Sequence, residues 1–436
     1  MTRQNRIVSL NNKWFGRYEL FLFIIISFAG VISSVLTYSL LDDYPYNSGK
    51  NLVGVFVPPI LTVFYLTISG FIYKFDKILL KKAVVLYLIQ IIPFFPLFFQ
   101  TFRPTTADDF SRYYLYAKNM IEHKTFWGGD RLFFKDEGNY FVTQPGYRYF
   151  VAGQLLLFRD LYRFVSFINV GLLICAIYYF QKLIVETIAD SRLRTGILIL
   201  NVLFVPYAIK NLLMGLPEWF TVLLLMAGSY LYIIKKKELL AMFILGMVPF
   251  FRQNLLITVV LLALWIVLSS RKPVKAFIFF LVPLLLPLYH NLYFSGEWRF
   301  FVRIFNMPFL NQSMDNNTSS VMDYDLIVQN ILHYTGIDMK NGRLDIHLEA
   351  VIFLPFFLIL YFIMLKTITP FRLKLVFITI SLSAIVPAIL FGTAYYPRFE
   401  FVNVIITLVT YLLLQSCTKT SIGEPSRYFS NKIVPE

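Results

Sequence analysis

Residues 254–270 have the sequence Asn-Leu-Leu-Ile-Thr-Val-Val-Leu-Leu-Ala-Leu-Trp-Ile-Val-Leu-Ser-Ser, which contains no charged side chain. Arg252 precedes this stretch, and Arg271 and Lys272 follow it. An apolar helix needs about 20 residues to cross the hydrocarbon core of a bilayer, and this stretch approaches that length. We therefore predict that residues 254–270 form a membrane-spanning helix.

Similar apolar runs recur along the whole chain. The predicted spans are 19–40, 52–73, 83–100, 164–181, 195–211, 213–234, 238–251, 254–270, 276–294, 350–366, 373–393 and 399–416. The 436 residues are 58% apolar and only 15% charged, whereas soluble domains have about 45–50% apolar and about 25% charged residues. The sequence thus predicts an all-α integral membrane protein with about 12 transmembrane helices, folded as a single polytopic membrane domain over residues 1–436.

The basic residues predict which way the spans run. More than half of the 40 Lys and Arg residues lie in the N-terminal leader, the C-terminal tail and alternate short loops, and such residues favour the cytoplasmic side. Both termini, including the tail 418–436, are therefore predicted to be cytoplasmic, in a plasma membrane or bacterial inner membrane. The long segments 101–163 and 295–349 then face outward, and we expect short interfacial helices in this extracytoplasmic region.

Several function classes are excluded by what the sequence lacks. The net charge of +15 needs no nucleic-acid partner, because inner-loop cations beside anionic lipid account for most of it. No glycine-rich phosphate loop or dinucleotide fingerprint occurs, which argues against a nucleotide-driven enzyme. The two Cys and four His show no metal-ligand spacing. No metal or other cofactor is indicated, although a divalent ion is compatible with the chemistry proposed below.

An acidic pair, Asp108 and Asp109, stands near the start of segment 101–163. Thr105 or Thr106 followed by two acids is typical of a helix start, and the acids favour the positive end of the helix dipole. Capping, or an ion pair with Arg112, explains either carboxylate alone. Two adjacent carboxylates cannot both occupy the cap, so one is available as a general base toward a hydroxyl group.

Aromatic and polar residues follow in the same segment, including Trp127, Gln144, Tyr147 and Arg148. Aromatic faces and hydrogen-bonding groups suit sugars, whereas an interfacial aromatic belt is the alternative explanation. Residues 148–163 are too short an apolar run to cross, and we predict a helix that lies in the interface.

Other ionisable residues stand at the outer edge of the predicted spans. Glu218 lies in an apolar run, where a carboxylate should face the bundle and have a partner, and a structural pair with Lys210 is the preferred explanation. Arg252 and Arg398 have two explanations: a guanidinium fork for a lipid-linked phosphate, or extension to the lipid headgroups. His290 is either an acid or base, or a hydrogen-bonded structural residue.

The order of these motifs resembles the C-type (GT-C) superfamily of polyprenyl-phosphate-sugar-dependent membrane glycosyltransferases. The resemblance rests on the Asp-Asp pair, the Tyr-Tyr-Leu-Tyr-Ala-Lys-Asn-Met stretch at residues 113–120, and Gln-Pro-Gly-Tyr-Arg-Tyr at 144–149. His-Asn-Leu-Tyr-Phe-Ser-Gly at 290–296 and Tyr-Tyr-Pro-Arg-Phe at 395–399 agree with it. In such enzymes the acidic motif usually follows the first span, whereas here it follows the third, which implies two additional N-terminal helices or a shifted architecture.

The resemblance implies an inverting hexosyl or pentosyl transferase, similar to mannosyltransferases, that builds a cell-envelope glycan or glycolipid on the outer face. The donor would be a polyprenyl-phosphate sugar and the acceptor a hydroxyl of a glycan, lipid or protein, with one Asp of the pair as the base. The residues implied are Asp108 and Asp109 for catalysis; Arg252, Arg398 and Lys210 for the donor phosphate; and Arg112, Tyr113, Trp127, Gln144, Tyr147, Arg148, His290, Asn291 and Tyr395 for substrate.

Two other classes remain open. A polysaccharide polymerase or a flippase for lipid-linked sugars would also have many spans, outer arginines and a large outer loop. A secondary transporter ranks third, because transporters favour internal repeats and ionisable residues near the midplane.

Overall fold

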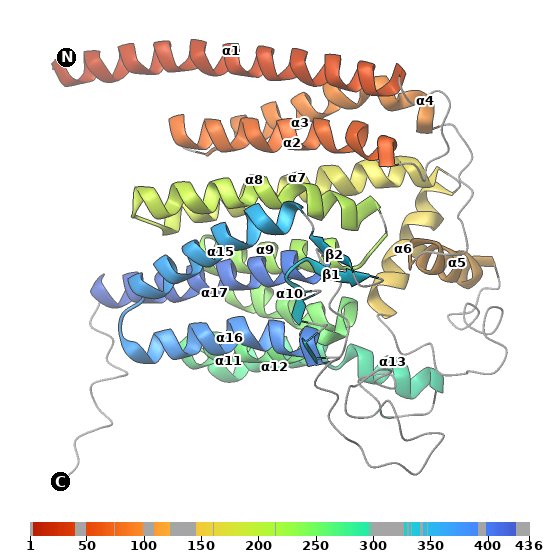
Figure 1. The fold of residues 1–436 in the computed structure, drawn as a ribbon. Helices are drawn as coiled ribbons and strands as arrows, with labels where there is room; N and C mark the ends of the chain where they lie inside the picture. Colours follow the sequence, from red (N-terminus) through yellow and green to blue (C-terminus); the bar gives the residue numbers. More distant parts are fainter. Residues whose placement is uncertain are drawn as a thin grey trace, which may run out of the picture. The chain divides into compact units, whose positions relative to one another are not determined.

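The fold is seen in a computed structural model that describes residues 3–39, 49–73, 75–98, 109–122, 145–159, 161–213, 215–295, 298, 327–328, 331–332, 334–340, 343–346, 348–390 and 398–423 (Figure 1). The elements are α1 (Arg3–Ser39), α2 (Gly49–Ile72), α3 (Lys77–Ile91), η1 (Ile92–Phe94), α4 (Phe95–Phe98), α5 (Asp109–Glu122), α6 (Pro145–Phe158), α7 (Tyr162–Thr187), α8 (Ser191–Leu213), α9 (Glu218–Ile233), α10 (Glu238–Phe251), η3 (Gln253–Leu255), α11 (Leu256–Ser269), α12 (Pro273–Leu284), α13 (Leu286–Ser295), β1 (Ile337–Lys340), β2 (Arg343–Ile346), α15 (Leu348–Thr367), α16 (Phe371–Leu390) and α17 (Arg398–Gly423).

Helices occupy every predicted span, and their lengths confirm only part of the predicted membrane topology. Among the described residues, four helical stretches are long and apolar enough to cross a membrane: Gly16–Leu36, Phe164–Thr187, Ser191–Leu213 and Pro273–His290. Six further apolar helices are shorter, at 10–17 residues. The chain therefore has the character of a membrane protein, whereas the count of 12 crossings stays a prediction.

Two predicted spans differ from the helices found. The predicted span 213–234 is shorter, because α8 ends at Leu213 and α9 begins only at Glu218. The predicted span 276–294 is interrupted at Leu285, between α12 and α13. Segment 295–349, predicted without strands, contains the antiparallel hairpin of β1 and β2, and α17 extends to Gly423, into the predicted tail.

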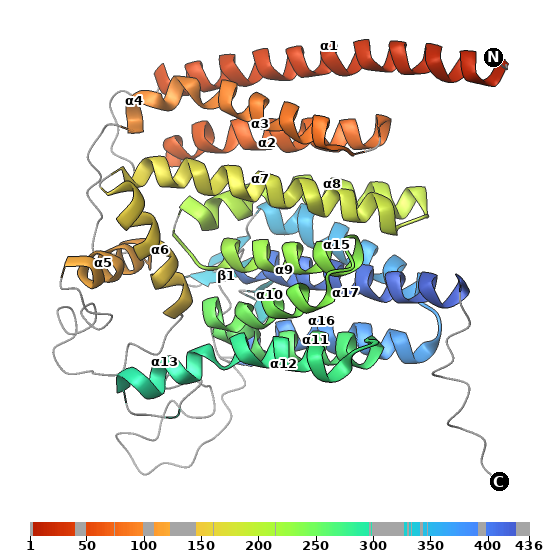
Figure 2. The ribbon, with the colours of Figure 1, turned by 180° about the vertical axis from the view of Figure 1, so that it is seen from behind.

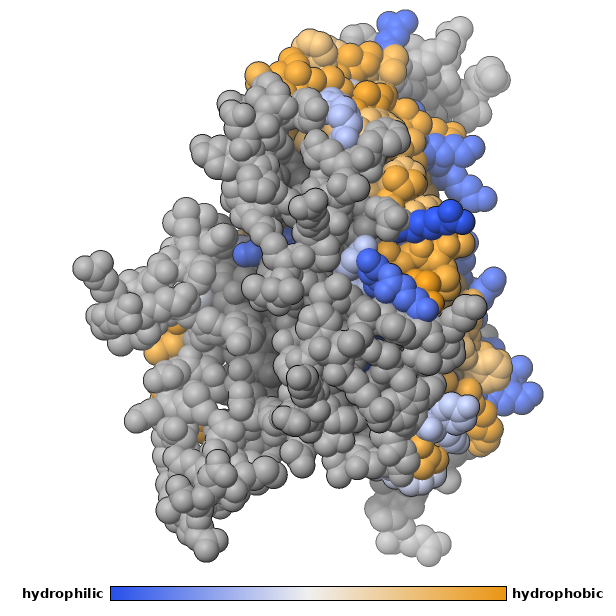
Figure 3. Space-filling model, turned by 90° about the vertical axis from the view of Figure 1, so that its right-hand side faces the viewer, coloured by the Kyte–Doolittle hydropathy of each residue, from blue (hydrophilic) through white to orange (hydrophobic). Residues whose placement is uncertain are grey.

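Large apolar side chains cover much of the described surface. On α1 alone, Phe21, Ile24, Phe28 and Leu36 are each more than half exposed. The described part of the surface at the top of Figure 3, over α1 to α3, is accordingly hydrophobic. Soluble monomers rarely expose contiguous apolar surface of this kind, so it indicates contact with lipid.

The chain forms two compact units. Unit 1 comprises residues 1–182, 198–223 and 287–302, and unit 2 comprises residues 183–197, 224–286 and 303–436. In unit 1, α1, α2 and α3 pack side by side, as both ribbon views show (Figures 1 and 2).

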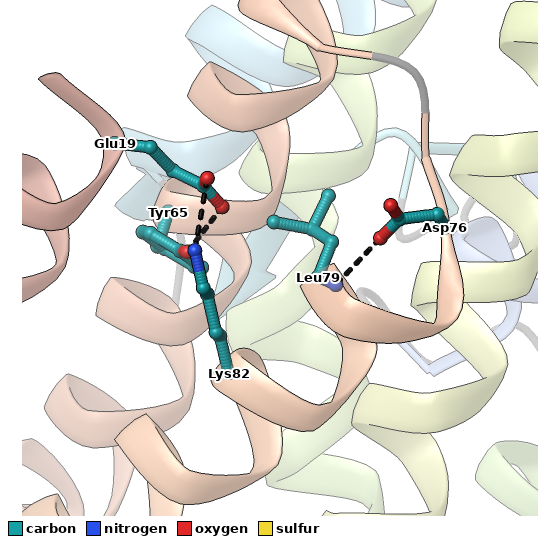
Figure 4. Close-up of polar contacts among 5 residues, drawn as sticks. All are labelled: Glu19, Tyr65, Asp76, Leu79 and Lys82. Atoms are coloured by element: carbon teal, nitrogen blue, oxygen red, sulfur yellow. Dashed lines mark hydrogen bonds and ion pairs between the residues drawn. The ribbon is translucent and has the colours of Figure 1, made fainter. Parts of the chain in front are cut away.

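A polar cluster joins these three helices (Figure 4). Lys82 Nζ of α3 lies 2.9 Å from Glu19 Oε2 of α1, and Tyr65 of α2 donates a hydrogen bond of 3.2 Å to the other oxygen of Glu19. At the start of α3, Asp76 caps the helix by accepting from the backbone N–H of Leu79 at 2.8 Å. This carboxylate satisfies an N–H group that the helix itself leaves without a partner.

A second connection between α1, α2 and α3 uses uncharged groups. Thr62 Oγ1 of α2 donates to Gln90 Oε1 of α3 at 2.9 Å, and Gln90 Nε2 donates to the carbonyl of Ile26 in α1. Gly30 allows this approach, because a Cβ there would lie 2.5 Å from the Gln90 side chain. The three helices are therefore held in register by polar contacts as well as by apolar packing.

In unit 2, helix α10 packs closely against α12. At Gly246 of α10, an added Cβ would lie only 2.3 Å from the backbone carbonyl oxygen of Phe280. Helix α17 is buried without interruption from Phe401 to Leu414, so it forms part of the core of this unit. Asn403 of α17 donates a hydrogen bond of 2.6 Å to the hydroxyl of Tyr334. This bond connects α17 to the segment before β1.

Substitution of Gly246 by Ala should destabilise unit 2, because the new methyl group meets backbone that cannot move aside. We expect a loss of about 1–3 kcal/mol, the usual range for overpacking, measured as a lower thermal unfolding midpoint in detergent. Gly16→Ala in α1 is the matched control, since nothing lies within 4 Å of a Cβ there. An equal midpoint for both variants would contradict the close α10–α12 contact.

Candidate functional site

Helix α5 has the second residue of the acidic pair, Asp109, at its N-terminus. It begins at Asp109 and buries Tyr113, Ala117 and Met120. These three residues follow helical spacing and share one face. On the exposed part of the same helix, Lys118 and Glu122 form an ion pair of 3.5 Å across one turn.

Helix α6 packs against α5 through aromatic rings. The rings of Tyr113 and Tyr147 meet edge to face with centroids 5.2 Å apart. Phe150, one turn along α6 from Tyr147, contacts Trp219 and Phe220 at centroid distances of 5.9 and 4.2 Å. We call these five residues, Tyr113, Tyr147, Phe150, Trp219 and Phe220, the Tyr147 cluster; all lie in unit 1.

A hydrogen bond fixes the orientation of two of these rings. Trp219 Nε1 donates to Tyr147 Oη at 3.2 Å, and both side chains are buried. Burial raises the pKa of the Tyr147 phenol well above its usual range. The phenol therefore stays protonated at physiological pH and can donate its own proton in a further hydrogen bond.

The turn between α8 and α9 places Glu218 beside this cluster. Gly215 adopts a left-handed φ of 62°. The backbone N–H of Gly215 donates to the carbonyl of Leu212 at 3.0 Å, and the backbone N–H of Leu216 donates to the carbonyl of Asn211 at 2.9 Å. This pair of bonds is a Schellman ending, for which glycine is the favoured residue. The chain reverses there, and Glu218 enters the first turn of α9, where a negative charge interacts favourably with the helix dipole.

Two ionisable side chains are thereby buried in unit 1. Glu218 has no exposed surface, and Arg148, next to Tyr147 in α6, is only 4% exposed. The predicted pair between Lys210 and Glu218 is wrong: Lys210 is exposed in the last turn of α8, and none of the described ion pairs joins them. The reversal at Gly215 explains this, because it directs Glu218 into the unit while Lys210 remains on the surface.

His290 lies in the same unit on α13. Its ring meets that of Tyr149 edge to face at 5.6 Å. Burial raises the pKa of Tyr149 to about 12, and the positive charge of Arg148 acts in the opposite direction. Tyr149 is therefore neutral at physiological pH, and its ring gives the predicted His290 an aromatic neighbour.

The structure thus unites part of the predicted site. Tyr113, Tyr147, Arg148 and His290 all fall in unit 1, on α5, α6 and α13. Four predicted residues lie outside the described residues: Asp108, Trp127, Gln144 and Tyr395. Four others belong to described helices with side chains outside the description: Asp109, Arg112, Asn291 and Arg398.

Arg252 belongs to unit 2. It occupies an extended position between α10 and η3, where its N–H bonds to the carbonyl of Val248 at 2.9 Å. The side chain is 7% exposed, so it lies inside the unit instead of extending from its surface. Among the described residues, no group of three His, Cys, Asp or Glu side chains is placed to hold a metal ion.

Trp219, Phe150 and Phe220 were missed by the sequence reasoning. Trp219 directly follows Glu218 in the stretch Gly-Leu-Pro-Glu-Trp at residues 215–219. A glycine and a proline before an acid indicate a helix end followed by a new helix start, and this signal was available. The contact of Phe150 and Phe220 with the other rings had no comparable signal.

No protein-family model, curated protein sequence or solved structure matches this chain.

Removal of the Tyr147 hydroxyl should weaken the fold slightly, and removal of its ring should weaken it strongly. We expect Tyr147→Phe to cost about 0.5–1.5 kcal/mol through the lost Trp219 bond and Tyr147→Ala about 3–5 kcal/mol through the cavity. Thermal unfolding in detergent measures both. Tyr289→Phe on α13 is the control, because Tyr289 is 54% exposed and should change nothing. Equal stability of wild type and Tyr147→Ala would contradict the packing described.

Proposed function

We propose that this protein transfers a sugar from a polyprenyl-phosphate carrier to an acceptor hydroxyl at the outer face of the membrane. The observation that carries the proposal is the burial of Arg148 and Glu218 beside the aromatic cluster that holds α5. Ionisable groups placed inside a membrane protein are costly and usually functional.

Arg148 supports the proposal through its burial and its place in α6. It lies in the first turn of α6, where the helix dipole disfavours a cation, and its burial adds a desolvation cost. A guanidinium in such a place suits an anionic ligand, since it offers a planar fork to phosphate oxygens. We assign Arg148 to the donor phosphate or to an acidic acceptor group.

The packing of α5 supports a role for the acidic pair. Asp109 is the first residue of α5 and stands one turn before Tyr113, which the Tyr147 cluster holds. Residues four apart share one side of a helix. We propose that Asp109 or Asp108 acts as the general base and that Tyr147 and Trp219 hold α5 in the position this requires.

The test is sugar transfer from a labelled polyprenyl-phosphate sugar by purified protein. We expect Asp108→Asn or Asp109→Asn to lower kcat by about 100-fold or more, the usual contribution of a general base, with little change in the unfolding midpoint. Glu122→Gln is the matched control, since it removes a carboxylate from the exposed face of the same helix. Full activity of both Asp variants would remove the proposed mechanism.

Absence of transfer by wild-type protein, together with movement of the labelled lipid across vesicle membranes, would instead identify a flippase. Formation of a chain from a lipid-linked oligosaccharide would identify a polymerase. Both outcomes reject the proposed reaction while leaving the description of the fold unchanged.

The role of Arg148 has a separate test. Arg148→Lys keeps the charge but loses the fork, so we expect KM for the lipid-phosphate donor to rise about tenfold or more, corresponding to about 1.4 kcal/mol, with a smaller effect on kcat. The control Arg159→Lys changes an exposed arginine just beyond the end of α6. An unchanged KM in Arg148→Lys would exclude contact between Arg148 and the donor phosphate.

A further inference from the structure

Unit 2 gathers basic residues from two connections that are distant in sequence. The α9–α10 connection contributes Lys235, Lys236 and Lys237, and the stretch from the end of α11 into α12 contributes Arg271, Lys272 and Lys275. All six side chains are exposed. We call these six residues the basic cluster.

A hydrogen bond network holds the two connections together. The hydroxyl of Ser270, directly after α11, donates to Glu238, the first residue of α10. Ser270 also accepts from the backbone N–H of Lys272 at 2.9 Å. Because α10 and α12 pack against each other and both begin at these connections, their first residues are brought to the same end of unit 2.

The charge of these two connections is strongly unbalanced. Glu238 is the acid within residues 234–238 and 270–275, and it already accepts the bond from Ser270. Lys235 lies over the ring of Tyr230 at 5.9 Å from its centroid, which orders its stem without neutralising its charge. Six cations against one acid favour an anionic partner.

Apolar residues beside the basic cluster identify which anion fits. Leu268, the residue before the last of α11, is 79% exposed, and Val274 in α12 is 70% exposed. On α12, Phe277 and Ile278 continue this exposed apolar surface at 42% and 50%. A soluble phosphate makes no use of such surface, whereas a lipid places its headgroup on the cations and its chains against the apolar side chains.

We propose that the basic cluster is a binding site for an anionic phospholipid headgroup, with the acyl chains lying along α11 and α12. This inference does not depend on the proposed sugar transfer, because it rests on unit 2 residues with no assigned catalytic role. It differs from the general attraction of inner-loop cations to anionic lipid, since it requires the two connections to act together.

The test uses protein purified in neutral detergent and titrated with dioctanoyl phosphatidylglycerol, with the thermal unfolding midpoint as readout. Dioctanoyl phosphatidylcholine is the uncharged-headgroup control. We expect the midpoint of wild type to rise with phosphatidylglycerol alone. The triple variant Lys235→Gln, Lys236→Gln, Lys237→Gln should bind about tenfold or more weakly, because it removes three of the six cations of the cluster.

Two further variants keep the test decisive. Arg271→Gln, Lys272→Gln, Lys275→Gln removes the other half of the cluster and should give a similar loss, even where the first variant folds poorly. Arg17→Gln, Lys77→Gln, Lys81→Gln removes three exposed cations of unit 1 and should bind as wild type does. Equal losses in all three variants would mean diffuse charge attraction and would overturn the site.

Competition separates the lipid from a soluble anion. Sodium phosphate at constant ionic strength should leave phosphatidylglycerol binding unchanged. Displacement of the lipid by phosphate, or an equal response to phosphatidylcholine, would reject the proposed ligand, as would a wild-type midpoint that phosphatidylglycerol does not shift.

Discussion

Polar groups that lie among apolar helices have to find partners inside the protein, because hydrocarbon offers none. In unit 1, several such groups pair through hydrogen bonds between helices. Thr62 and Gln90 join α2 to α3, Gln181 of α7 donates to Thr67 of α2 at 2.8 Å, and Gln154 of α6 donates to Asn169 of α7 at 2.5 Å. These bonds form a chain from α3 to α6. The position of α6, and with it that of the candidate site, therefore depends on polar contacts made far from the site.

Among the described residues, the buried charges occur where regular helices begin or break. Glu218 stands at the start of α9 after the reversal at Gly215, and Arg252 occupies the extended residue between α10 and η3. Arg148 lies in the first turn of α6. Helix ends leave backbone groups available to polar neighbours, which makes them suitable places for ionisable side chains in an apolar protein. The helix dipole favours the negative charge of Glu218 and disfavours the positive charge of Arg148 at these positions.

The apolar runs predicted where helices form, because every long run had to be buried or placed in lipid. They did not predict the break before Glu218. Gly215 and Pro217 lie within one apolar run, and hydropathy alone predicts an uninterrupted helix through them. Lys210 was predicted to pair with Glu218 because it was the available cation near the end of the neighbouring span, but Lys210 lies exposed at the end of α8. The bond between Trp219 and Tyr147 joins residues 72 positions apart. Local sequence patterns indicate which face of a helix is buried, but they do not identify the helix that covers it. The contact between Trp219 and Tyr147 could therefore be found only from the folded structure.

The distribution of charge also bears on the choice between an enzyme and a transporter. Transport along a path through the bilayer favours ionisable residues near the middle of spans. In the stretch Ser191–Leu213, one of the four described stretches long enough to cross, the buried polar residue at the centre is the neutral Asn201 of α8. The buried charged side chains of the described residues lie instead at helix ends and breaks. They are Arg148, Glu218 and Arg252. The proposed sugar transfer requires a charged headgroup to be held while the lipid tail remains among helices, and a buried charge at a helix end, such as Arg148 in α6, supports that proposal.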